Sequence, residues 1–502
     1  MLINKDFYIT STLPYVNAEP HIGHAMEFIR ADIIARYKLM LGYGVFFNTG
    51  TDEHGSKIQE AADEKGVTPK DLVDGLAVRY EELRRSLGLC DAVHSIRTTE
   101  KRHVEAAQEF WKRCDKNGYI YKKFYATKYC VGCELNKTDS ELENGKCPIH
   151  PNREIEIIEE ENYFFKFSAF TKPLADFYAK NPSFIVPDFR YNEIKAFVDR
   201  GLEDFSISRL KSKMSWGIPV PGDDAHVMYV WFDALVSYIS TLGWPSNEES
   251  FDKWWVKTGG VVQYCGKDNL RQQAAIWQAM LMAAGLPNSK QIVINGFITG
   301  EGGIKMSKSI GNVVSPFDVV REYNTDTLRY YVSRELAPFE DSPFTLDMLK
   351  MAYNSALANG IGNLLSRVTK MAETNNVKLG AGDDAGAGGS ADEMIAATRA
   401  DLTKLSQEHE YCKLMDRFDI KGAADLIWAK IAWADKRIQD EQPFKLVKTD
   451  AVRGKMIISD LLKELVTISV WLEPILPTTA AAIQECLRSG GVPKVALFAR
   501  KD

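Results

Sequence analysis

The chain begins with a β-strand, an amphipathic helix and a second β-strand in direct succession. Residues 7–10 and 45–48 are rich in β-forming side chains. Between them, apolar side chains recur at spacings of three and four, at Ile22, Met26, Ile29, Ile33, Tyr37 and Met40. Such a βαβ unit is typical of a parallel sheet with helices on its faces, so the chain is predicted to be an α/β protein.

The βαβ pattern is interrupted between residues 119 and 222, where the sequence is aromatic, basic and cysteine-containing with weak helical periodicity. β-rich runs return at 261–266 and 291–296, so an inserted domain is predicted to split the sheet domain. Beyond residue 346 strand patterns disappear, and apolar residues at helical spacing predict a helical bundle.

Length and composition place the chain among ordinary globular proteins. Its 502 residues predict about three domains, and 45% hydrophobic with 26% charged residues exclude collagen, coiled-coil arrays and wholesale disorder. The net charge of −6 argues against nonspecific wrapping of nucleic acid, although a local basic face remains compatible with it. No segment is apolar enough for a membrane span and the first ten residues lack a secretory pattern, so we expect a cytoplasmic protein.

Two short motifs, far apart in the chain, are typical of polyphosphate binding. His21 and His24 lie at the start of the predicted helix, where free backbone N–H groups and the helix dipole favour phosphate, and Gly23 allows a close approach. Lys305 and Lys308 lie in a glycine-rich loop that could close two ammonium groups over a polyphosphate. Each motif alone also occurs on solvated surfaces. The two motifs together, flanking a split βαβ domain, are a far more specific indication of polyphosphate binding than either motif alone.

Four potential metal ligands cluster in the inserted region. Cys130 and Cys133 are separated by two residues, and after thirteen more residues Cys147 and His150 repeat that spacing. Three thiolates and one imidazole in two short turns suit one tetrahedral zinc ion. Because four protein ligands leave no open position, the site is predicted to be structural. The alternative is a surface His150 with water as the fourth ligand.

The two phosphate-binding motifs read HIGH and KMSKS letter for letter, and with them the chain resembles the class I aminoacyl-tRNA synthetases. Within that class it is similar to the methionyl-tRNA synthetases. The further matching segments are TLPY at 12–15, Asn17, TDEHG at 51–55, WGIPVP at 216–221, WFDA at 231–234, GKD at 266–268 and NLLSR at 363–367.

The resemblance implies an order of domains. A Rossmann-like parallel-sheet catalytic domain would comprise residues 1–118 and 223–325, split by a zinc-binding connective insertion at 119–222. A stem-contact segment at 326–350 and an all-α anticodon-binding bundle at 351–502 would follow.

The resemblance also implies an activity, the ATP-dependent activation of L-methionine to methionyl-adenylate and its transfer to the 3′-terminal adenosine of methionine tRNA. Catalysis of this kind is positioning and charge stabilisation, for which His21, His24, Lys305 and Lys308 would supply donors. Magnesium would accompany the ATP. The implied ATP-binding residues are Asn17, Gly23, Gly266, Lys267, Asp268, Met306 and Ser307.

For the amino acid, the resemblance places Asp52 opposite the α-amino group. Leu13, Tyr15, Trp231, Ala234 and Tyr238 would form the side-chain pocket, and Thr12 is a further implied methionine-binding residue. A thioether is apolar and polarizable, so shape, aromatic contact and a weak donor such as the Tyr238 hydroxyl would select it. Gln273 stands where the family commonly carries a pocket histidine, and we expect it in the pocket wall. Asn363, Arg367 and Phe444, the last in place of a common tryptophan, would recognise the anticodon.

Three alternatives compete with this interpretation. A sister class I synthetase of the branched-chain type would need a larger inserted editing domain, and a cysteinyl one an active-site zinc. Small nucleotidyltransferases with the HxGH motif lack a helical RNA-binding domain of this size. A non-catalytic, synthetase-like tRNA-binding protein would have lost its histidines and lysines. No appended oligonucleotide-binding domain of the kind that dimerises relatives is recognisable, so a monomer is expected.

Overall fold

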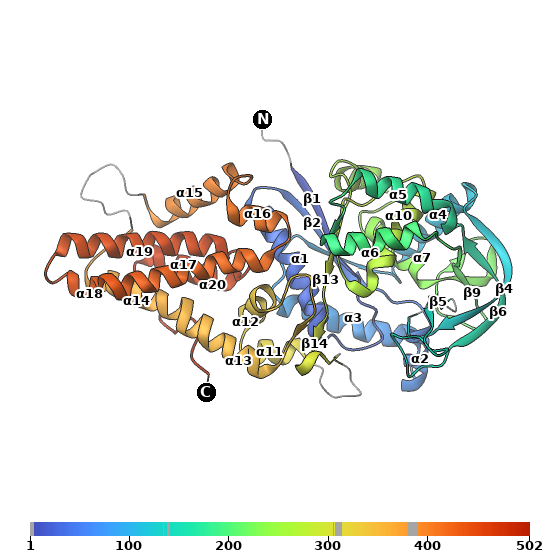
Figure 1. The fold of residues 1–502 in the computed structure, drawn as a ribbon, viewed down its shortest axis with the longest axis horizontal. Helices are drawn as coiled ribbons and strands as arrows, with labels where there is room; N and C mark the ends of the chain where they lie inside the picture. The colour runs from blue at the N-terminus through green and yellow to red at the C-terminus, as the bar shows by residue number, and fades with distance from the viewer. Residues whose placement is uncertain are drawn as a thin grey trace.

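The computed structural model describes residues 5–133, 135–137, 141–304, 306, 314–379 and 389–501. A helical bundle forms one end of the molecule and an α/β region the other, with the inserted segment at the far side of that region (Figure 1).

A six-stranded, all-parallel sheet lies at the centre of the α/β region. Its strand order is β3-β2-β1-β12-β13-β7. The strands are β1 (Asp6–Ser11), β2 (Gly44–Thr51), β3 (Val93–Arg97), β12 (Val262–Gly266), β13 (Gln291–Asn295) and β7 (Ile185–Val186). The short β7 comes from within the expected insertion at 119–222 and pairs with β13, so the inserted sequence also completes the sheet.

The strand order reverses direction between β1 and β12. From β1 the chain passes through α1 (Ile22–Met40) to β2 on one side, and much later it enters β12 on the other side of β1. In open α/β sheets, ligands bind outside the carboxyl ends of the strands at this switch point. The amino terminus of α1 lies at the same point, because a crossover helix follows the carboxyl end of its strand. Residues 11–24 and 266–268 lie at this switch point and are therefore candidates for ligand binding.

The helices around the sheet are α2 (Ser56–Lys65), α3 (Pro69–Ser86), α4 (Lys101–Lys116), α7 (Val230–Ala234), α8 (Ser237–Ser240), α9 (Glu248–Phe251) and α10 (Trp277–Ala283). They contribute to two apolar cores. The core containing α1 continues into the bundle, whereas α4, α8 and α10 share the second with the insertion. The first core thus joins the sheet to the bundle and the second joins it to the insertion. The strands can contribute to both cores because they are apolar on both faces.

The insertion consists of small antiparallel sheets and two helices. One sheet has the order β5-β4-β6-β8 and another the order β10-β11-β9. The strands are β4 (Ile120–Cys130), β5 (Leu135–Lys137), β6 (Glu156–Phe165), β8 (Phe205–Ser206), β9 (Ser208–Leu210), β10 (Pro219–Val220) and β11 (Asp223–Met228); the helices are α5 (Thr171–Lys180) and α6 (Asp188–Asp199).

After the sheet, a short connecting region leads into the bundle. It contains β14 (Ile298–Thr299), α11 (Pro316–Glu322), α12 (Thr325–Tyr330) and β15 (Ser342–Pro343). The bundle consists of α13 (Leu346–Ala352), α14 (Asn363–Thr374), α15 (Ala391–Lys404), α16 (Glu410–Asp416), α17 (Ile420–Glu441), α18 (Pro443–Leu446), α19 (Ala451–Leu472) and α20 (Pro477–Ser489). The predicted α/β region followed by a helical bundle is confirmed.

A buried arginine connects the sheet region to the bundle. Arg329 of α12 forms an ion pair of 2.7 Å with Asp32 of α1, and both side chains are fully buried. Its remaining donors reach the carbonyls of Leu87, Pro474 and Ile475. These contacts tie α1 to the segment that precedes α20.

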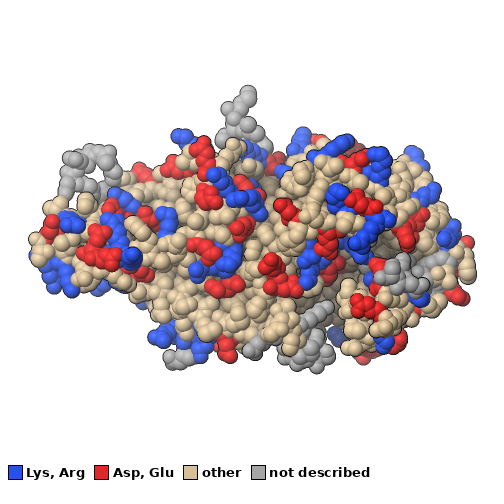
Figure 2. Space-filling view, viewed as in Figure 1, with Lys and Arg blue, Asp and Glu red and all other residues tan. Residues whose placement is uncertain are grey.

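Charged side chains of both signs lie on the face of the molecule drawn in Figure 2. Lys and Arg side chains are interspersed there with Asp and Glu. Among the helices that the structure describes, none has the length and hydropathy that a bilayer crossing requires.

Candidate active site

The loops after β1 and β2 come together at the switch point of the sheet. The Thr12 N–H donates to the carbonyl of Tyr264 in β12 at 3.0 Å, which holds the end of β1 beside β12. Tyr15 and Asp52 pair in a parallel bridge, and the Asp52 N–H donates to the carbonyl of Pro14 at 2.9 Å. Four residues expected in the amino-acid pocket, Thr12, Leu13, Tyr15 and Asp52, are therefore neighbours.

The two histidines of the HIGH motif cap helix α1. Nδ1 of His21 accepts from the Gly23 N–H at 3.1 Å, and Nδ1 of His24 accepts from the His21 N–H at 3.2 Å. The two rings stack with their centroids 3.8 Å apart. This reciprocal pattern is a capping box in which imidazoles replace the usual hydroxyl and carboxylate.

The capping bonds decide which proton each imidazole can donate. A nitrogen that accepts a backbone N–H carries no proton, so Nε2 of His21 and of His24 is the protonated atom. Burial, with the adjacent His21 as a second cause, lowers the pKa of His24 well below its ordinary value, so this ring stays neutral at pH 7. Both Nε2–H groups belong to the end of a helix that favours anions.

The KMSKS motif falls mainly outside the residues that the structure describes. Lys305, Ser307 and Lys308 are not among them. Met306 is described and packs, partly buried, against the core that contains α1. The Ile22 N–H of α1 donates to the carbonyl of Val314 at 3.3 Å, so the first described residue after the motif contacts the start of the HIGH helix.

A glycine makes room for Tyr15. Gly55 has a φ of 112°, and a Cβ there would lie 2.4 Å from the Tyr15 hydroxyl oxygen. The same Cβ would lie 3.5 Å from Val230, the first residue of α7. The Tyr15 hydroxyl and the start of the helix that carries Trp231 and Ala234 therefore both lie against Gly55.

A buried carboxylate joins the loop that carries Asp52 to α7. Asp233 is fully buried and contacts Nδ1 of His54 through one oxygen and Nε2 of His103 through the other, each at 2.7 Å. Although burial opposes its ionisation, the two histidines hold the pKa of Asp233 below its usual value. We call these three residues the Asp233 clamp.

The aromatic segment expected in the pocket is buried beside this clamp. Ala234, Tyr238 and Gln273 are 8%, 3% and 0% exposed, and the Gln273 amide donates to the Tyr238 hydroxyl at 2.7 Å. Trp231 is partly buried, and its indole N–H is shielded from solvent with no hydrogen-bond partner among the described residues. Gln273 therefore lies next to Tyr238, as expected of a pocket-wall residue.

The residues expected to bind ATP lie at the end of β12 and after β1. Gly266 ends β12 and is followed by Lys267 and Asp268, while Asn17 is partly buried in the loop before α1. The Lys267 ammonium forms an ion pair of 2.7 Å with Asp341, a partner that sequence reasoning did not identify.

Glu27, on the first turns of α1, lies behind the end of β1. One of its carboxyl oxygens accepts from the Thr12 N–H at 2.5 Å. Burial raises the pKa of Glu27 to about 8, and the negative charge of Asp268 adds to the effect. This shift favours the protonated form of the Glu27 carboxyl group near neutral pH.

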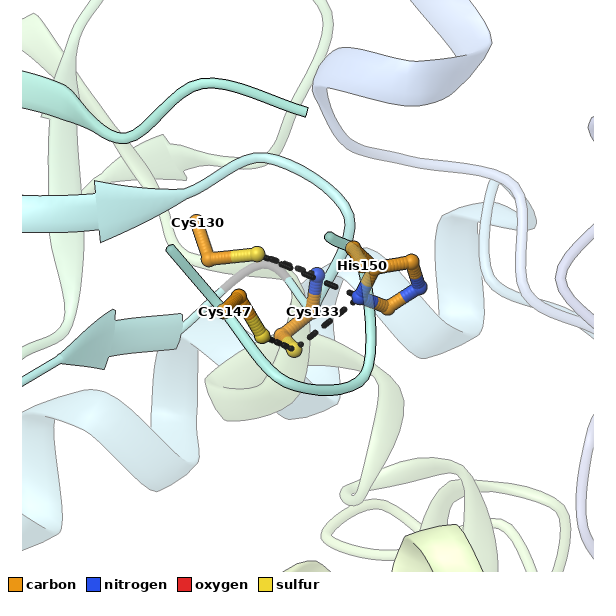
Figure 3. A group of neighbouring side chains, drawn as sticks. All are labelled: Cys130, Cys133, Cys147 and His150. Atoms are coloured by element: carbon orange, nitrogen blue, oxygen red, sulfur yellow. Dashed lines mark hydrogen bonds between the residues drawn. The ribbon is translucent and has the colours of Figure 1, made fainter. Parts of the chain in front are cut away.

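The predicted metal ligands converge in the insertion. Cys130, Cys133, Cys147 and His150 place one ligand atom each within 4.8 Å of one another (Figure 3). Cys133 Sγ lies 3.4 Å from Cys147 Sγ and 3.3 Å from His150 Nδ1. A Cβ on Gly132 would lie 2.4 Å from the His150 ring, so only glycine permits this turn. The set can hold a metal ion.

The metal-binding segment contacts the sheet domain near the pocket. Arg271, two residues before Gln273, forms an ion pair of 2.8 Å with Glu141, and Arg153 approaches Glu60 at 3.7 Å. The segment that carries the cysteine cluster therefore contacts the sheet domain near Gln273.

The expected anticodon-recognition residues lie in the bundle. Asn363 begins α14 and is exposed, whereas Arg367, one turn later, forms an ion pair of 2.9 Å with Asp435 of α17. Phe444 lies in α18, directly after α17, with 42% of its surface exposed. The half-buried guanidinium and the exposed aromatic ring thus lie on different helices of the bundle, α14 and α18.

Comparison with known proteins identifies the family. The family model described as tRNA synthetases class I (M) matches residues 7–156 and 138–369. The methionine–tRNA ligase of Caldanaerobacter subterraneus is 39% identical over 97% of this chain and 74% of its own length. The chain belongs to the class I methionyl-tRNA synthetase family. The Brucella suis methionine–tRNA ligase, 37% identical, is covered over 92% of its length.

Solved structures of this family share the fold. The Mycobacterium tuberculosis methionyl-tRNA synthetase in complex with methionyl-adenylate superposes with a TM-score of 0.86 at 33% identity, over 98% of this chain and 95% of that one. A second structure of that enzyme bound by methionyl-adenylate gives a TM-score of 0.87. The resemblance drawn from the HIGH and KMSKS motifs is confirmed, and so is the synthetase fold.

Sequence reasoning missed several polar residues of this synthetase site. His54 and Asp233 lie inside the TDEHG and WFDA segments, so motif matching could have raised them. His103, Gln263 and Ser289 are isolated polar residues without a local pattern, and only their buried contacts reveal them.

Proposed function

We propose that the chain activates L-methionine with ATP to methionyl-adenylate and transfers the methionyl group to the 3′-terminal adenosine of methionine tRNA. The observation that supports this function is that the loop before the HIGH helix meets the Asp52 loop at the switch point, while Asp233 joins the Asp52 loop to α7. Membership in the methionyl-tRNA synthetase family supports methionine as the amino acid that is activated.

In the proposed reaction, the methionine carboxylate attacks the α-phosphate in line and pyrophosphate departs. Asp52 pairs with the α-amino group, and Leu13, Tyr15, Trp231, Ala234 and Tyr238 surround the thioether. His21 and His24 donate their Nε2–H groups to phosphate oxygens, while Lys305 and Lys308 neutralise the leaving pyrophosphate. Asp268 accepts from the ribose hydroxyls. Magnesium bound with ATP offsets further phosphate charge.

ATP–pyrophosphate exchange, run separately with each standard amino acid and without tRNA, tests this function. Exchange with methionine alone supports the assignment. Exchange with a different amino acid would move the chain to a sister synthetase, and no exchange from folded, metal-replete protein would favour a non-catalytic tRNA-binding role.

We further propose that the Cys130, Cys133, Cys147 and His150 cluster holds one zinc ion with a structural role. Three thiolates and an imidazole are a preferred donor set for tetrahedral zinc, and four protein ligands leave no open position for substrate. We also propose that the protein is cytoplasmic and acts as a monomer; all the proposed catalytic and pocket residues lie on one chain.

Removing the metal is expected to loosen the insertion rather than to abolish the chemistry directly. The purified protein should contain about one zinc per chain, and Cys147→Ser should lower that content and the Tm. Elemental analysis and thermal unfolding check this, with Cys114→Ser, a buried cysteine outside the cluster, as the control. Full metal content in Cys147→Ser would contradict the assignment.

The anticodon proposal predicts a split between two activities. Arg367→Ala should lower kcat/KM for tRNA charging by about tenfold or more, because a hydrogen bond to a base edge is lost, and leave methionine activation unchanged. Aminoacylation and ATP–pyrophosphate exchange measured on the same preparation test it. Arg399→Ala, which removes another ion-paired arginine of the bundle, is the control. Equal loss of both activities would assign Arg367 to stability alone.

A further inference from the structure

A line of hydrogen-bonded side chains runs from the backbone of Ser289 to the hydroxyl group of Tyr238. Gln278 contacts Ser289, and Ser289 Oγ donates to Gln263 at 2.6 Å. The Gln263 amide donates to the Gln273 oxygen at 2.6 Å, and the Gln273 amide donates to Tyr238 at 2.7 Å. All five residues are at most 5% exposed. We call this line the glutamine relay.

Two backbone groups decide the direction of every bond in the relay. The Ser289 N–H can only donate, and it donates to Gln278 Oε1 at 3.0 Å. The carbonyl of Gln273 can only accept, and it accepts from Gln278 Nε2 at 2.9 Å. Gln278 is therefore held in one orientation from both sides.

The orientation of Gln278 propagates to the far end. Because Gln278 Nε2 donates to Ser289 Oγ at 3.1 Å, the serine proton is directed to Gln263 Oε1. Gln263 then presents its amide to Gln273 Oε1, and Gln273 presents its own amide to Tyr238. The Tyr238 oxygen is left as an acceptor toward the protein.

The direction of these hydrogen bonds determines where the Tyr238 hydroxyl can donate its own proton in a hydrogen bond. The Tyr238 hydroxyl accepts from the Gln273 amide, and a side-chain hydrogen bond from Gln263 also acts on it. Among the hydrogen bonds of the described residues, it donates to no protein acceptor. Burial raises the pKa of Tyr238 above its ordinary value, so the proton stays on the oxygen. A ligand atom in the pocket is the remaining acceptor for it.

The family resemblance already implies the Tyr238 hydroxyl as a donor to the sulfur of methionine. We propose that the glutamine relay fixes the direction of this donor, and that Gln263, Gln273 and Ser289 are positioning residues for amino-acid specificity. The inference rests on the proposed methionine activity. Norleucine has a methylene in place of the sulfur and nearly the same shape, so a hydrophobic pocket alone separates the two poorly. A donor aimed at sulfur favours methionine, because norleucine leaves that donor unpaired.

The test compares kcat/KM for methionine and norleucine in ATP–pyrophosphate exchange. Tyr238→Phe, which removes the donor itself, should lower the methionine-to-norleucine ratio by about fivefold to tenfold. Gln263→Leu should lower the ratio by a similar factor. Gln273 is then free to turn its oxygen toward Tyr238 and accept the hydrogen bond that the hydroxyl would otherwise donate to the ligand. Ser289→Ala, a smaller change, breaks the same relay should the leucine variant fold poorly.

A double mutant separates positioning from general damage. In Tyr238→Phe combined with Gln263→Leu the ratio should equal that of Tyr238→Phe alone, because the relay acts only through this hydroxyl. Gln263→His, whose ring can accept and donate in the same sense, should restore the ratio. Gln272→Leu, a buried neighbour outside the relay, is the matched control.

The outcomes distinguish this inference from the proposed function. Methionine exchange by the unaltered protein with unchanged ratios in Gln263→Leu and Ser289→Ala would overturn the relay alone. Ratios that fall additively in the double mutant would also overturn it, since Gln263 would then act independently of Tyr238. Absence of methionine exchange by the unaltered protein would overturn the function first, and the relay with it.

Discussion

Replacing His24 with asparagine is expected to slow methionine-dependent ATP–pyrophosphate exchange by about 100- to 1,000-fold while leaving the protein folded. The asparagine oxygen can take over the capping bond that Nδ1 of His24 accepts from the His21 N–H. Its shorter side chain cannot place a donor where Nε2–H lies. The variant therefore removes the phosphate donor and keeps the helix cap. Steady-state exchange and thermal unfolding measure the two effects separately.

The matched variant His24→Gln should show the reverse pattern. A glutamine amide can reach the position of Nε2, but its geometry does not preserve the capping bond. We expect a loss of about 1 kcal/mol in the free energy of unfolding and a smaller loss of rate than in His24→Asn. Equal rates in the unaltered protein and His24→Asn would show that His24 acts only as a cap.

Replacing Asp233 with alanine is expected to lower the free energy of unfolding by about 3–5 kcal/mol. Asp233 is fully buried and bonds His54 and His103 at 2.7 Å each, so its removal strands two buried imidazoles. The KM for methionine should also rise, because the Asp233 clamp joins the loop of Asp52 to α7, which carries Trp231. Denaturant unfolding and exchange kinetics measure the two losses.

An exposed aspartate provides the control for that effect. Asp74 forms an ion pair with Arg97 at 2.5 Å but is 41% exposed, so Asp74→Ala should cost about 0.2–1 kcal/mol. A similarly small loss of unfolding free energy in Asp233→Ala would mean that the Asp233 clamp stabilises the fold no more than an exposed ion pair does.

The clamp also has a defined pH dependence. The pKa of Asp233 is lowered in the folded protein, so the stability that it contributes is fully present above the unfolded value of about 4. That contribution is lost as the pH falls from there through the folded pKa. Between the unaltered protein and Asp233→Ala, the difference in unfolding free energy should therefore shrink below about pH 4.

Local sequence determined the elements and the motifs of this protein. The apolar stripe beginning at Ile22 predicted a helix that the structure places at Ile22–Met40. The paired spacings of Cys130, Cys133, Cys147 and His150 predicted a ligand set that converges within 4.8 Å. The helix depends on residues three and four positions apart, and each ligand pair on residues three positions apart, whose geometry the helix or turn already dictates.

Tertiary structure alone decided which polar residues became buried partners. Asp32 interrupts the apolar pattern of α1 and reads as solvent-facing, yet it is fully buried against Arg329 from almost three hundred positions later. The Asp233 clamp and the glutamine relay likewise assemble from distant segments. A buried polar group is stable only with its partner in place. Periodicity carries local information, whereas such partners meet only when the sheet, the insertion and the bundle pack together.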